Sequence, residues 1–324
     1  MKKNIAVIMG GYSLEYDISI KSGDNVIKKI DKSRYNIFKV VIDETKWVHI
    51  DHLNNEYNIN KDNFTVFINN SIVNFDLVFN MIHGDPGENG VIQKYFENLK
   101  IKFTGPSSEI AKLTFNKKKC INYLSNFSIK TAKSYLLKRD ENYDLKNIIN
   151  DLNFPMFVKA NKSGSSFGVY KAYNKDEIIK YIQDIFKIYN EIIIERYIKG
   201  REFSVGIINN INRVKSLGVT ELISENDFFD YQAKYEGKHK DFTPAKIDTK
   251  LERLLKNNAE KICGILKIPG FSRIDFIVEK NTPFFLEINT IPGMTDQSIF
   301  PKQVVLNNFN LKDLFTDIIE NSIK

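Results

Sequence analysis

The sequence contains little cysteine, and it has no long apolar run. Its two cysteines, Cys120 and Cys263, stand far apart without CxxC or Cys/His spacing. This argues against a disulfide scaffold or a zinc site, and it is typical of a reduced compartment. No stretch approaches the roughly 18 consecutive apolar residues of a membrane helix, and the apolar segment after Met1 is too short for a signal peptide. We therefore expect a cytoplasmic protein without a membrane partner.

Arginine is also scarce, and this shortage bears on the net charge. Lys and Arg number 47 against 40 Asp and Glu, which gives +7, and such an excess can indicate a nucleic-acid partner. Only seven of the basic residues are arginines, whereas base recognition depends on the bidentate guanidinium. The lysines are spread along the whole chain, so we expect no nucleic-acid partner. The 324 residues are 42% hydrophobic and 27% charged, which predicts a globular protein of two or three domains.

The pattern of the N-terminal third predicts a parallel α/β unit. A buried strand over 5–9 runs into Gly10-Gly11, and a helix is expected over 16–30. The segment 43–74 is Asn-rich with short β-like pieces and separates two further strands. Other expected elements are strands at 35–42, 75–81, 154–160, 191–197 and 202–208, a long loop at 227–244, a helix at 251–266 and a hairpin at 272–290.

The hairpin over 272–290 carries polar side chains on one face. Strand side chains alternate, so Arg273 and Asp275 share a face, as do Glu287 and Asn289 on the next strand. The turn at 280–282 predicts a register that places Asp275 opposite Glu287. Like charges across a ladder destabilise it, and two carboxylates with an amide oxygen suit magnesium. The alternative is an exposed polar face on which Arg273 neutralises a carboxylate.

A Gly/Ser-rich loop at 162–168 follows Lys159. Its backbone N–H groups can approach phosphates, although the GxxxxGK[ST] pattern of a P-loop is missing; the alternative is a flexible surface turn. Lys159 follows apolar Phe157 and Val158, and burying it requires an anionic partner, either a phosphate or a structural carboxylate. A third polar loop, from His83 to Gly90, follows a buried strand, where α/β proteins bind ligands.

Together these stretches resemble the D-alanine–D-alanine ligases of the ATP-grasp superfamily over nearly the whole chain. The motifs that carry the resemblance are Gly10-Gly11-x-Ser13-x-Glu15, His83-Gly84-x-x-Gly87-Glu88-x-Gly90, Lys159 with Gly164-Ser165-Ser166-x-Gly168, Gly200-x-Glu202-Phe203, Tyr231-x-Ala233-Lys234-Tyr235, Arg273-x-Asp275-Phe276 and Glu287-x-Asn289-Thr290-x-Pro292-Gly293.

The resemblance implies a mixed α/β and α+β fold, a three-domain ATP-grasp architecture whose N-terminal domain is parallel and Rossmann-like. The expected domains are an N-terminal substrate domain at 1–112, a central ATP-grasp subdomain at 113–197 and a C-terminal subdomain at 198–324 with the magnesium site. The loop at 227–244 is expected to close as a lid over the phosphates; the alternative is an ordinary mobile insertion.

The activity implied is ATP-dependent ligation of two D-alanines through an acyl phosphate, for peptidoglycan precursor synthesis. A pair of Mg²⁺ ions, with Mn²⁺ as an alternative, is implied as well, and so is a homodimer. The implied metal ligands are Asp275, Glu287 and Asn289. Contacts to ATP are implied for Lys117, Lys159, Ser165, Ser166, Glu195, Tyr197, Ile198 and Glu202.

The remaining implied roles concern the reacting groups. Arg273 and the backbone N–H of Gly293 would stabilise the tetrahedral oxyanion. Glu15 would pair with the ammonium of the first D-alanine, beside whose carboxylate His83 would lie. Lys234 and Ser298 would hold the second carboxylate. Tyr235, linked to Ser165 and Glu15, is the pattern of ligases that make the dipeptide rather than use D-lactate.

The chain departs from the family pattern at Ala160, Asn89, Asn116 and Gln297, which stand where proline, an acidic residue, aspartate and histidine are usual. Lys118 and Lys119 adjoin Lys117, so a slip of one residue would change that assignment. The alternative functions are a D-alanine–D-lactate ligase and a nucleotide-binding regulator without catalysis. The intact set of Asp275, Glu287, Asn289 and Arg273 argues against the regulator.

Overall fold

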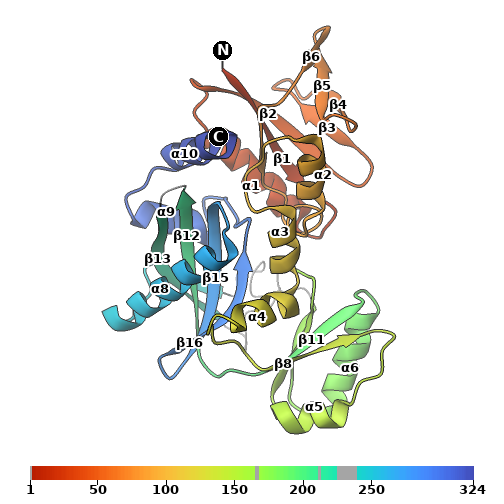
Figure 1. Cartoon of the computed structure of the whole chain (residues 1–324), viewed down its shortest axis with the longest axis vertical. Helices are drawn as coiled ribbons and strands as arrows, with labels where there is room; N and C mark the ends of the chain where they lie inside the picture. The colour runs from red at the N-terminus through yellow and green to blue at the C-terminus, as the bar shows by residue number, and fades with distance from the viewer. Residues whose placement is uncertain (1, 165–167, 211–212, 225–238) are drawn as a thin grey trace.

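The fold was analysed in a computed structural model, which describes residues 2–164, 168–210, 213–224 and 239–324. These residues form three sheets of seven, four and five strands. Each sheet occupies its own part of the molecule, and α3 (Ser108–Phe115) and α4 (Lys117–Ser125) run through the middle (Figure 1). Within the described part of the chain, no helix is both long and apolar enough to cross a membrane.

The N-terminal sheet has a parallel centre and an antiparallel extension. β1 (Lys3–Gly10) pairs in parallel with β2 (Tyr35–Ile42) on one side and with β7 (Leu77–Asn80) on the other. All four residues of β7 are buried, as expected of a strand covered on both faces. The parallel Rossmann-like centre predicted from the sequence is therefore confirmed. The antiparallel strands that follow β2 are β3 (Trp47–Ile50), β4 (Glu56–Asn60), β5 (Thr65–Ile68) and β6 (Ser71–Val73).

The helices that cover this sheet come from the N-terminal and the C-terminal parts of the chain. α1 (Tyr16–Lys29) begins where the motif after β1 ends, and α2 (Val91–Leu99) follows the loop after β7. α10 (Leu311–Ile323), the last helix, packs Phe315 against Phe79 of β7, with ring centroids 5.6 Å apart. The apolar core beneath α10 also contains residues of the C-terminal sheet, so the two ends of the chain share one core. Neither α10 nor the preceding α9 (Ile299–Leu306) is among the helices expected from the sequence.

The central part is a four-stranded antiparallel sheet with two helices on it (Figure 1). Its strands, in the order of the sheet, are β10 (Val169–Ala172), β9 (Met156–Ala160), β11 (Glu191–Arg196) and β8 (Ser134–Lys138), and the helices are α5 (Leu145–Leu152) and α6 (Lys175–Phe186). Because strand residues alternate, this leaves Phe157 and Lys159 on the face opposite to the helices.

The C-terminal sheet is antiparallel, and it is covered on one face by α8 (Thr249–Leu266) and α4. Its strands, in order, are β14 (His239–Phe242), β13 (Arg213–Ser224), β12 (Arg201–Asn210), β15 (Gly270–Glu279) and β16 (Thr282–Asn289). The prediction of an unbroken loop over 227–244 is wrong at its end, because 239–242 pair with β13 as an edge strand. Residues 225–238 lie outside the described part. The mixed α/β fold class is confirmed, whereas the division into three domains stays a prediction.

Candidate functional site

The predicted register of the β15–β16 hairpin is confirmed. Arg273 pairs with Asn289 and Asp275 pairs with Glu287, and a bulge follows at Asp275/Phe276. The irregularity leaves the polar pairs in register while Phe276 shifts to face Phe285. All four polar side chains therefore lie on one face of the sheet, opposite to the face that α8 covers.

Asp275 is the centre of this polar face, and it is 3% exposed. Its Oδ1 accepts hydrogen bonds from Ser204 Oγ at 2.5 Å and Arg273 Nε at 3.1 Å, and its Oδ2 accepts from Arg273 Nη2 at 3.0 Å and Asn289 Nδ2 at 2.9 Å. Burial lowers the pKa of Arg273, but the charge and hydrogen bonds of Asp275 outweigh it and raise that pKa overall. The alternative in which Arg273 neutralises a carboxylate is thus present in the structure, on a buried rather than an exposed face.

Lys117 reaches this face from α4. Its Nζ lies 3.0 Å from Glu287 Oε2 and 3.0 Å from the carbonyl oxygen of Ser163, in the Gly/Ser loop. The charge of Glu287 raises the pKa of Lys117 against the lowering effect of burial. Lys118 points elsewhere, because its Nζ donates to the backbone oxygen and the hydroxyl of Ser134. The helical turn therefore distinguishes the two lysines, and only Lys117 joins the carboxylates.

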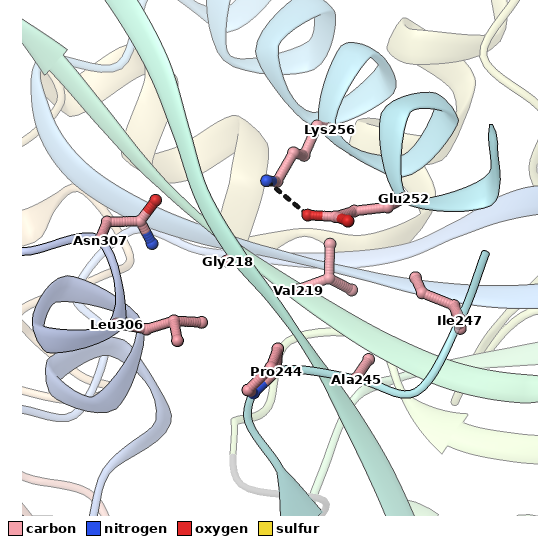
Figure 2. A pocket seen from close by; sticks show the side chains of 9 residues that line it. All are labelled: Gly218, Val219, Pro244, Ala245, Ile247, Glu252, Lys256, Leu306 and Asn307. Atoms are coloured by element: carbon pink, nitrogen blue, oxygen red, sulfur yellow. Dashed lines mark ion pairs between the residues drawn. The ribbon is translucent and has the colours of Figure 1, made fainter. Parts of the chain in front are cut away.

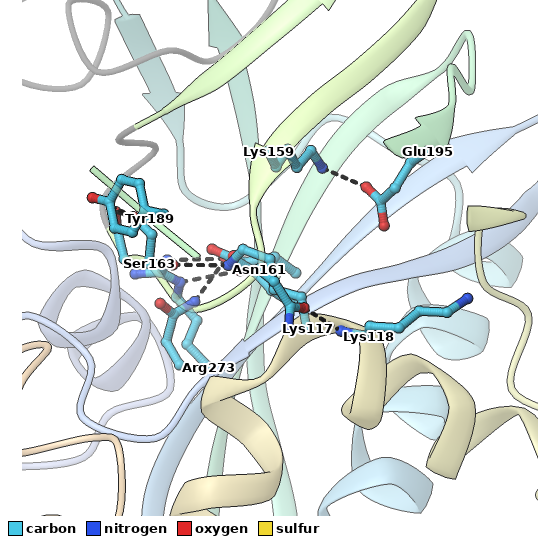
Figure 3. Close-up of polar contacts among 12 residues, drawn as sticks. Lys117, Lys118, Lys159, Asn161, Ser163, Tyr189, Glu195 and Arg273 are labelled. Carbon is cyan, nitrogen blue, oxygen red and sulfur yellow. Dashed lines mark hydrogen bonds and ion pairs between the residues drawn. The ribbon is translucent and has the colours of Figure 1, made fainter. Parts of the chain in front are cut away.

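Lys159 and Glu195 form a buried ion pair on the neighbouring sheet, 2.7 Å apart (Figure 3). Of the two anionic partners expected for Lys159, the structure therefore contains the carboxylate. Tyr197 follows the end of β11, and the Lys171 ammonium lies 4.2 Å from the centroid of its ring. The next residue, Ile198, is buried. The roles predicted for these residues toward ATP stay predictions.

Glu202 lies on the same face of β12 as Ser204, and it adjoins the polar face of the hairpin. Its partner on β15 is Ile277, two residues from Asp275. Burial raises the pKa of Glu202 to about 8, with further contributions from the charges of Asp275 and Glu287. Three carboxyl groups, those of Glu202, Asp275 and Glu287, are therefore close together between β12, β15 and β16, and their mutual repulsion favours the protonated form of Glu202.

Glu15 lies against two glycines from other segments. A Cβ added to Gly164 would come 2.4 Å from Glu15 Oε2, and one added to Gly84 would come 3.1 Å from the same atom. Only glycine therefore lets the Gly/Ser loop approach this carboxylate so closely. His83 is buried, and its Nε2 is 3.2 Å from Ser22 Oγ, which also accepts a hydrogen bond from the N–H of Met294.

Gly293 and Ser298 lie next to each other at the start of α9. A Cβ at Gly293 would come 2.9 Å from Ser298 Oγ, and that hydroxyl accepts a hydrogen bond from the N–H of Thr295. The structure thus brings together predicted residues from the first 90 residues, the central sheet and the last 50. The other predicted residues, Ser165, Ser166, Lys234 and Tyr235, lie outside the described part of the chain.

Glu88 belongs to the motif from His83 to Gly90, but no role is predicted for it from the sequence. Its Oε2 accepts a hydrogen bond from the N–H of Gly84 at 2.8 Å. Burial raises its pKa to about 8, and the nearby charge of Glu15 adds to the effect. The sequence contains a signal for such a role, because Glu88 is a carboxyl in the loop between the buried strand β7 and α2, and α/β proteins bind ligands in loops at this end of a strand.

A separate pocket lies between β13, the segment 244–247, the first turns of α8 and the end of α9 (Figure 2). Its lining includes the Glu252–Lys256 ion pair, 2.6 Å apart, and the apolar side chains of Val219 and Leu306. None of the predicted site residues lines this pocket. It is therefore distinct from the polar face of the hairpin.

Comparison with known proteins identifies the family. Residues 4–106 match the family model of the D-ala D-ala ligase N-terminus, and residues 123–320 match that of the D-ala D-ala ligase C-terminus. The chain belongs to the D-alanine–D-alanine ligase family. Its relatives include the D-alanine–D-alanine ligase of Flavobacterium johnsoniae, which is 44% identical over 321 residues, 99% of both chains.

Solved structures of the family share the whole fold. The VanG D-Ala:D-Ser ligase from Enterococcus faecalis superposes with a TM-score of 0.89 at 30% identity, covering 99% of this chain and 100% of the other. The D-alanine–D-alanine ligase from Bacillus anthracis complexed with ATP has a TM-score of 0.79 at 26% identity, covering 99% and 97%. The ATP-grasp architecture implied by the motifs is therefore confirmed.

Proposed function

We propose that this protein joins two D-alanines to D-alanyl-D-alanine at the expense of ATP, for peptidoglycan precursor synthesis. One observation carries the proposal beyond the family match. Lys117, the Ser163 carbonyl and Glu287 meet within hydrogen-bond distance, although they come from α4, the Gly/Ser loop and β16. A lysine held between a glycine-rich loop and a carboxylate pair suits the phosphates of a nucleotide and the cation that accompanies them.

The residues of the hairpin fit a magnesium ion by the chemistry of their donors. Asp275 and Glu287 supply carboxylates, and Asn289 has its amide nitrogen turned to Asp275, so its Oδ1 is the atom that would face the cation. Among the described residues, no group of three or more His, Cys, Asp or Glu side chains could hold a metal. Magnesium is commonly held by one or two protein carboxylates together with substrate phosphates and water, and Asp275 and Glu287 are two such carboxylates on one face. When bound, the cation would offset the negative charge of the phosphates.

The reaction would proceed in two steps. A carboxylate oxygen of the first D-alanine attacks the γ-phosphorus of ATP, and ADP leaves. The amine of the second D-alanine then attacks the carbonyl carbon, loses a proton and expels phosphate. Activation is needed because a carboxylate is a poor electrophile, and splitting the reaction replaces one difficult step by two easier ones.

The chain's own residues would hold these groups in place. Lys117 and Lys159 would bind the phosphates, with Ser165 and Ser166 of the loop beside them. Glu195, Tyr197 and Ile198 would line the adenine site, and Glu202 would accept the ribose hydroxyls. Lys159 would have to exchange its bond to Glu195 for a phosphate oxygen, or hold both.

The acceptor end would use residues from several segments of the chain. The Arg273 guanidinium and the N–H of Gly293 would stabilise the tetrahedral oxyanion, a contribution commonly of a few kcal/mol. Glu15 would hold the ammonium of the first D-alanine, and His83 would lie by its carboxylate. Ser298 and Lys234 would hold the second carboxylate, and Tyr235 with Ser165 would complete the link to Glu15. The part of 227–244 that precedes the edge strand β14 would act as a lid that keeps water from the acyl phosphate.

The activity is tested by incubating the protein with ATP, Mg²⁺ and D-alanine, and by measuring ADP and the dipeptide by chromatography with mass detection. Parallel reactions contain D-alanine with D-lactate or D-serine, since a structural relative is a D-Ala:D-Ser ligase. We expect D-alanyl-D-alanine as the main product near neutral pH. If ATP is consumed without D-alanine, or if a mixed product dominates, the proposed substrate is wrong. In Tyr235→Phe, selection for D-alanine over D-lactate should weaken.

Three finer points belong to the same proposal. We propose a cytoplasmic homodimer, because ATP is a cytoplasmic substrate and the family resemblance implies a dimer; light scattering coupled to gel filtration measures the mass. The division at residues 112 and 197 is supported by the three sheets, each of which lies within one of the proposed segments. Limited proteolysis with and without ADP would cut between these segments if they move against one another.

A further inference from the structure

Asn161 is a completely buried side chain whose hydrogen-bonding groups are all used. It follows β9 directly and has no exposed surface. Its N–H donates to the carbonyl of Glu191, and its side-chain Nδ2 donates to Glu191 Oε2 and to Asn116 Oδ1, the latter at 3.0 Å. Figure 3 shows it between Lys117 and Ser163. A buried amide costs free energy unless it is satisfied, and here it is satisfied by two other segments.

The first turn of α4 is bonded to this asparagine. The N–H of Lys117 donates to the backbone oxygen of Asn161 at 3.1 Å, and the N–H of Lys118 donates to its Oδ1 at 2.9 Å. The next N–H, of Lys119, donates to Asn116 Oδ1 at 2.9 Å. The N–H groups at the start of a helix otherwise lack partners. Because all three are taken, the backbone of this helix end is closed to a phosphate, and any anion here must be bound by side chains.

These bonds join the start of α4 to the end of β9 in the central sheet. α4 belongs to the C-terminal core through Cys120, Ile121 and Leu124, whereas Asn161 continues a strand of the central sheet. Lys159 lies two residues before Asn161, and Ser163 lies two residues after it. The carbonyl oxygen of Ser163 accepts a hydrogen bond from Lys117 Nζ. The contact therefore sets the position of Lys117 relative to Lys159.

We propose that Asn161 is a positioning residue, which holds Lys117 at the distance from Lys159 that phosphate binding requires. The inference rests on the proposed function, in which both lysines bind the phosphates. Asparagine suits the place because it offers one acceptor and two donors. Aspartate would lose both donors and would face Glu191 Oε2 and Asn116 Oδ1 with a third oxygen, and alanine would leave the N–H of Lys118 unsatisfied.

The test compares Asn161→Ala, Lys117→Ala and the double variant. ADP affinity is measured by calorimetry in the presence of Mg²⁺, and KM values are measured for ATP and for D-alanine. We expect Asn161→Ala to weaken ADP binding and raise KM for ATP about tenfold, with KM for D-alanine changed less than twofold. In the Lys117→Ala background the same substitution should add less than a threefold loss, because it acts through Lys117. Multiplying effects would overturn the proposal.

A matched control separates positioning from stability. The Asn209 side-chain amide also donates to a backbone carbonyl, that of Ile268, but both residues belong to the C-terminal part of the chain and neither contacts α4 or β9 through this bond. Asn209→Ala should lower the melting temperature without changing KM for ATP. If Asn161→Ala behaves in the same way, Asn161 is only structural and the proposal falls.

A milder variant covers the case in which Asn161→Ala does not fold. Asn116→Ser keeps a helix-capping oxygen for Lys119 but is too short to accept from Asn161 Nδ2. We expect ADP binding about threefold weaker; unchanged binding would overturn the proposal. The ADP titration is independent of the ligation assay. A wild type that binds ADP but makes no dipeptide would refute the proposed function and still test Asn161.

Discussion

Glu287→Gln tests the cation site with little disturbance to the fold. The Glu287 side chain is 38% exposed, and it forms an ion pair with Lys117, with 3.0 Å between Oε2 and Nζ. A partly exposed pair of this kind contributes about 1 kcal/mol or less to stability, and the glutamine oxygen can still accept from Lys117. Asp275→Ala is less suitable, because it removes the partner of the buried Arg273 guanidinium, a loss that costs about 3–5 kcal/mol.

The effect on the cation is expected to be much larger than the effect on folding. A unit charge 4 Å away contributes about 4 kcal/mol at an effective dielectric constant of about 20, and a divalent ion doubles this. Dehydration of the ion and carboxylate offsets most of the gain, which leaves about 2 kcal/mol, or roughly a 30-fold rise in the Mg²⁺ concentration for half-maximal rate.

The assay follows ADP by chromatography over a Mg²⁺ titration at saturating D-alanine. Glu279→Gln is the matched control, since Glu279 is a carboxylate of the same hairpin that lies four residues along β15 from Asp275 and pairs with Arg196 at 3.6 Å. Its Mg²⁺ curve should coincide with that of the wild type. Coincident curves for Glu287→Gln and wild type, in a protein with unchanged melting temperature, would refute the assignment of Glu287 as a ligand.

Three further predictions concern charge, packing and the choice between lysines. Because burial raises the pKa of Glu88 to about 8, the folded state retains a proton between pH 4.5 and 8 that the unfolded state has lost, so stability falls as pH rises through that window. Glu88→Gln should lack this fall and exceed the wild type by about 2 kcal/mol at pH 8.5 in urea unfolding; parallel pH profiles would contradict this. Phe315→Ala should lower the free energy of unfolding by about 3–5 kcal/mol, whereas Val305→Ala, at a residue that is 65% exposed, should change it by less than about 0.5 kcal/mol. Lys117→Ala should raise KM for ATP at least about tenfold and Lys118→Ala less than about threefold; equal effects would show that the two lysines share the role.

The polar face of the hairpin could be predicted from the sequence because its geometry is local. Strand side chains alternate, and the predicted pairs of Asp275 with Glu287 and of Arg273 with Asn289 are confirmed. The register that leaves the turn, with Glu279 opposite Thr282, reaches these pairs only through the bulge at Asp275/Phe276, which the sequence did not indicate. The parallel opening of the N-terminal sheet was equally predictable from one buried strand, a glycine turn and a helix. The short pieces in 43–74 were recognised as β-like, and they form β3 to β6.

Contacts between distant segments could not be predicted from the sequence. Lys117, Lys118 and Lys119 differ only by rotation around α4, and which of them meets Glu287, 170 positions away, depends on how α4 packs. The pairing of Lys159 with Glu195, the bonds of Asn161 to the first turn of α4 and the raised pKa of Glu88 likewise follow from burial and packing.

The sequence by itself determined the family, the order of the motifs and the residue types available for phosphate and metal chemistry. The tertiary structure decided which of those residues touch one another, and it showed that α10 closes a core shared by both ends of the chain. The physical reason is that propensity and periodicity act over a few residues. Buried ion pairs and the hydrogen bonds of buried side-chain amides, in contrast, form only where whole helices and strands pack together. A shift of one residue in that packing changes which side chains become partners.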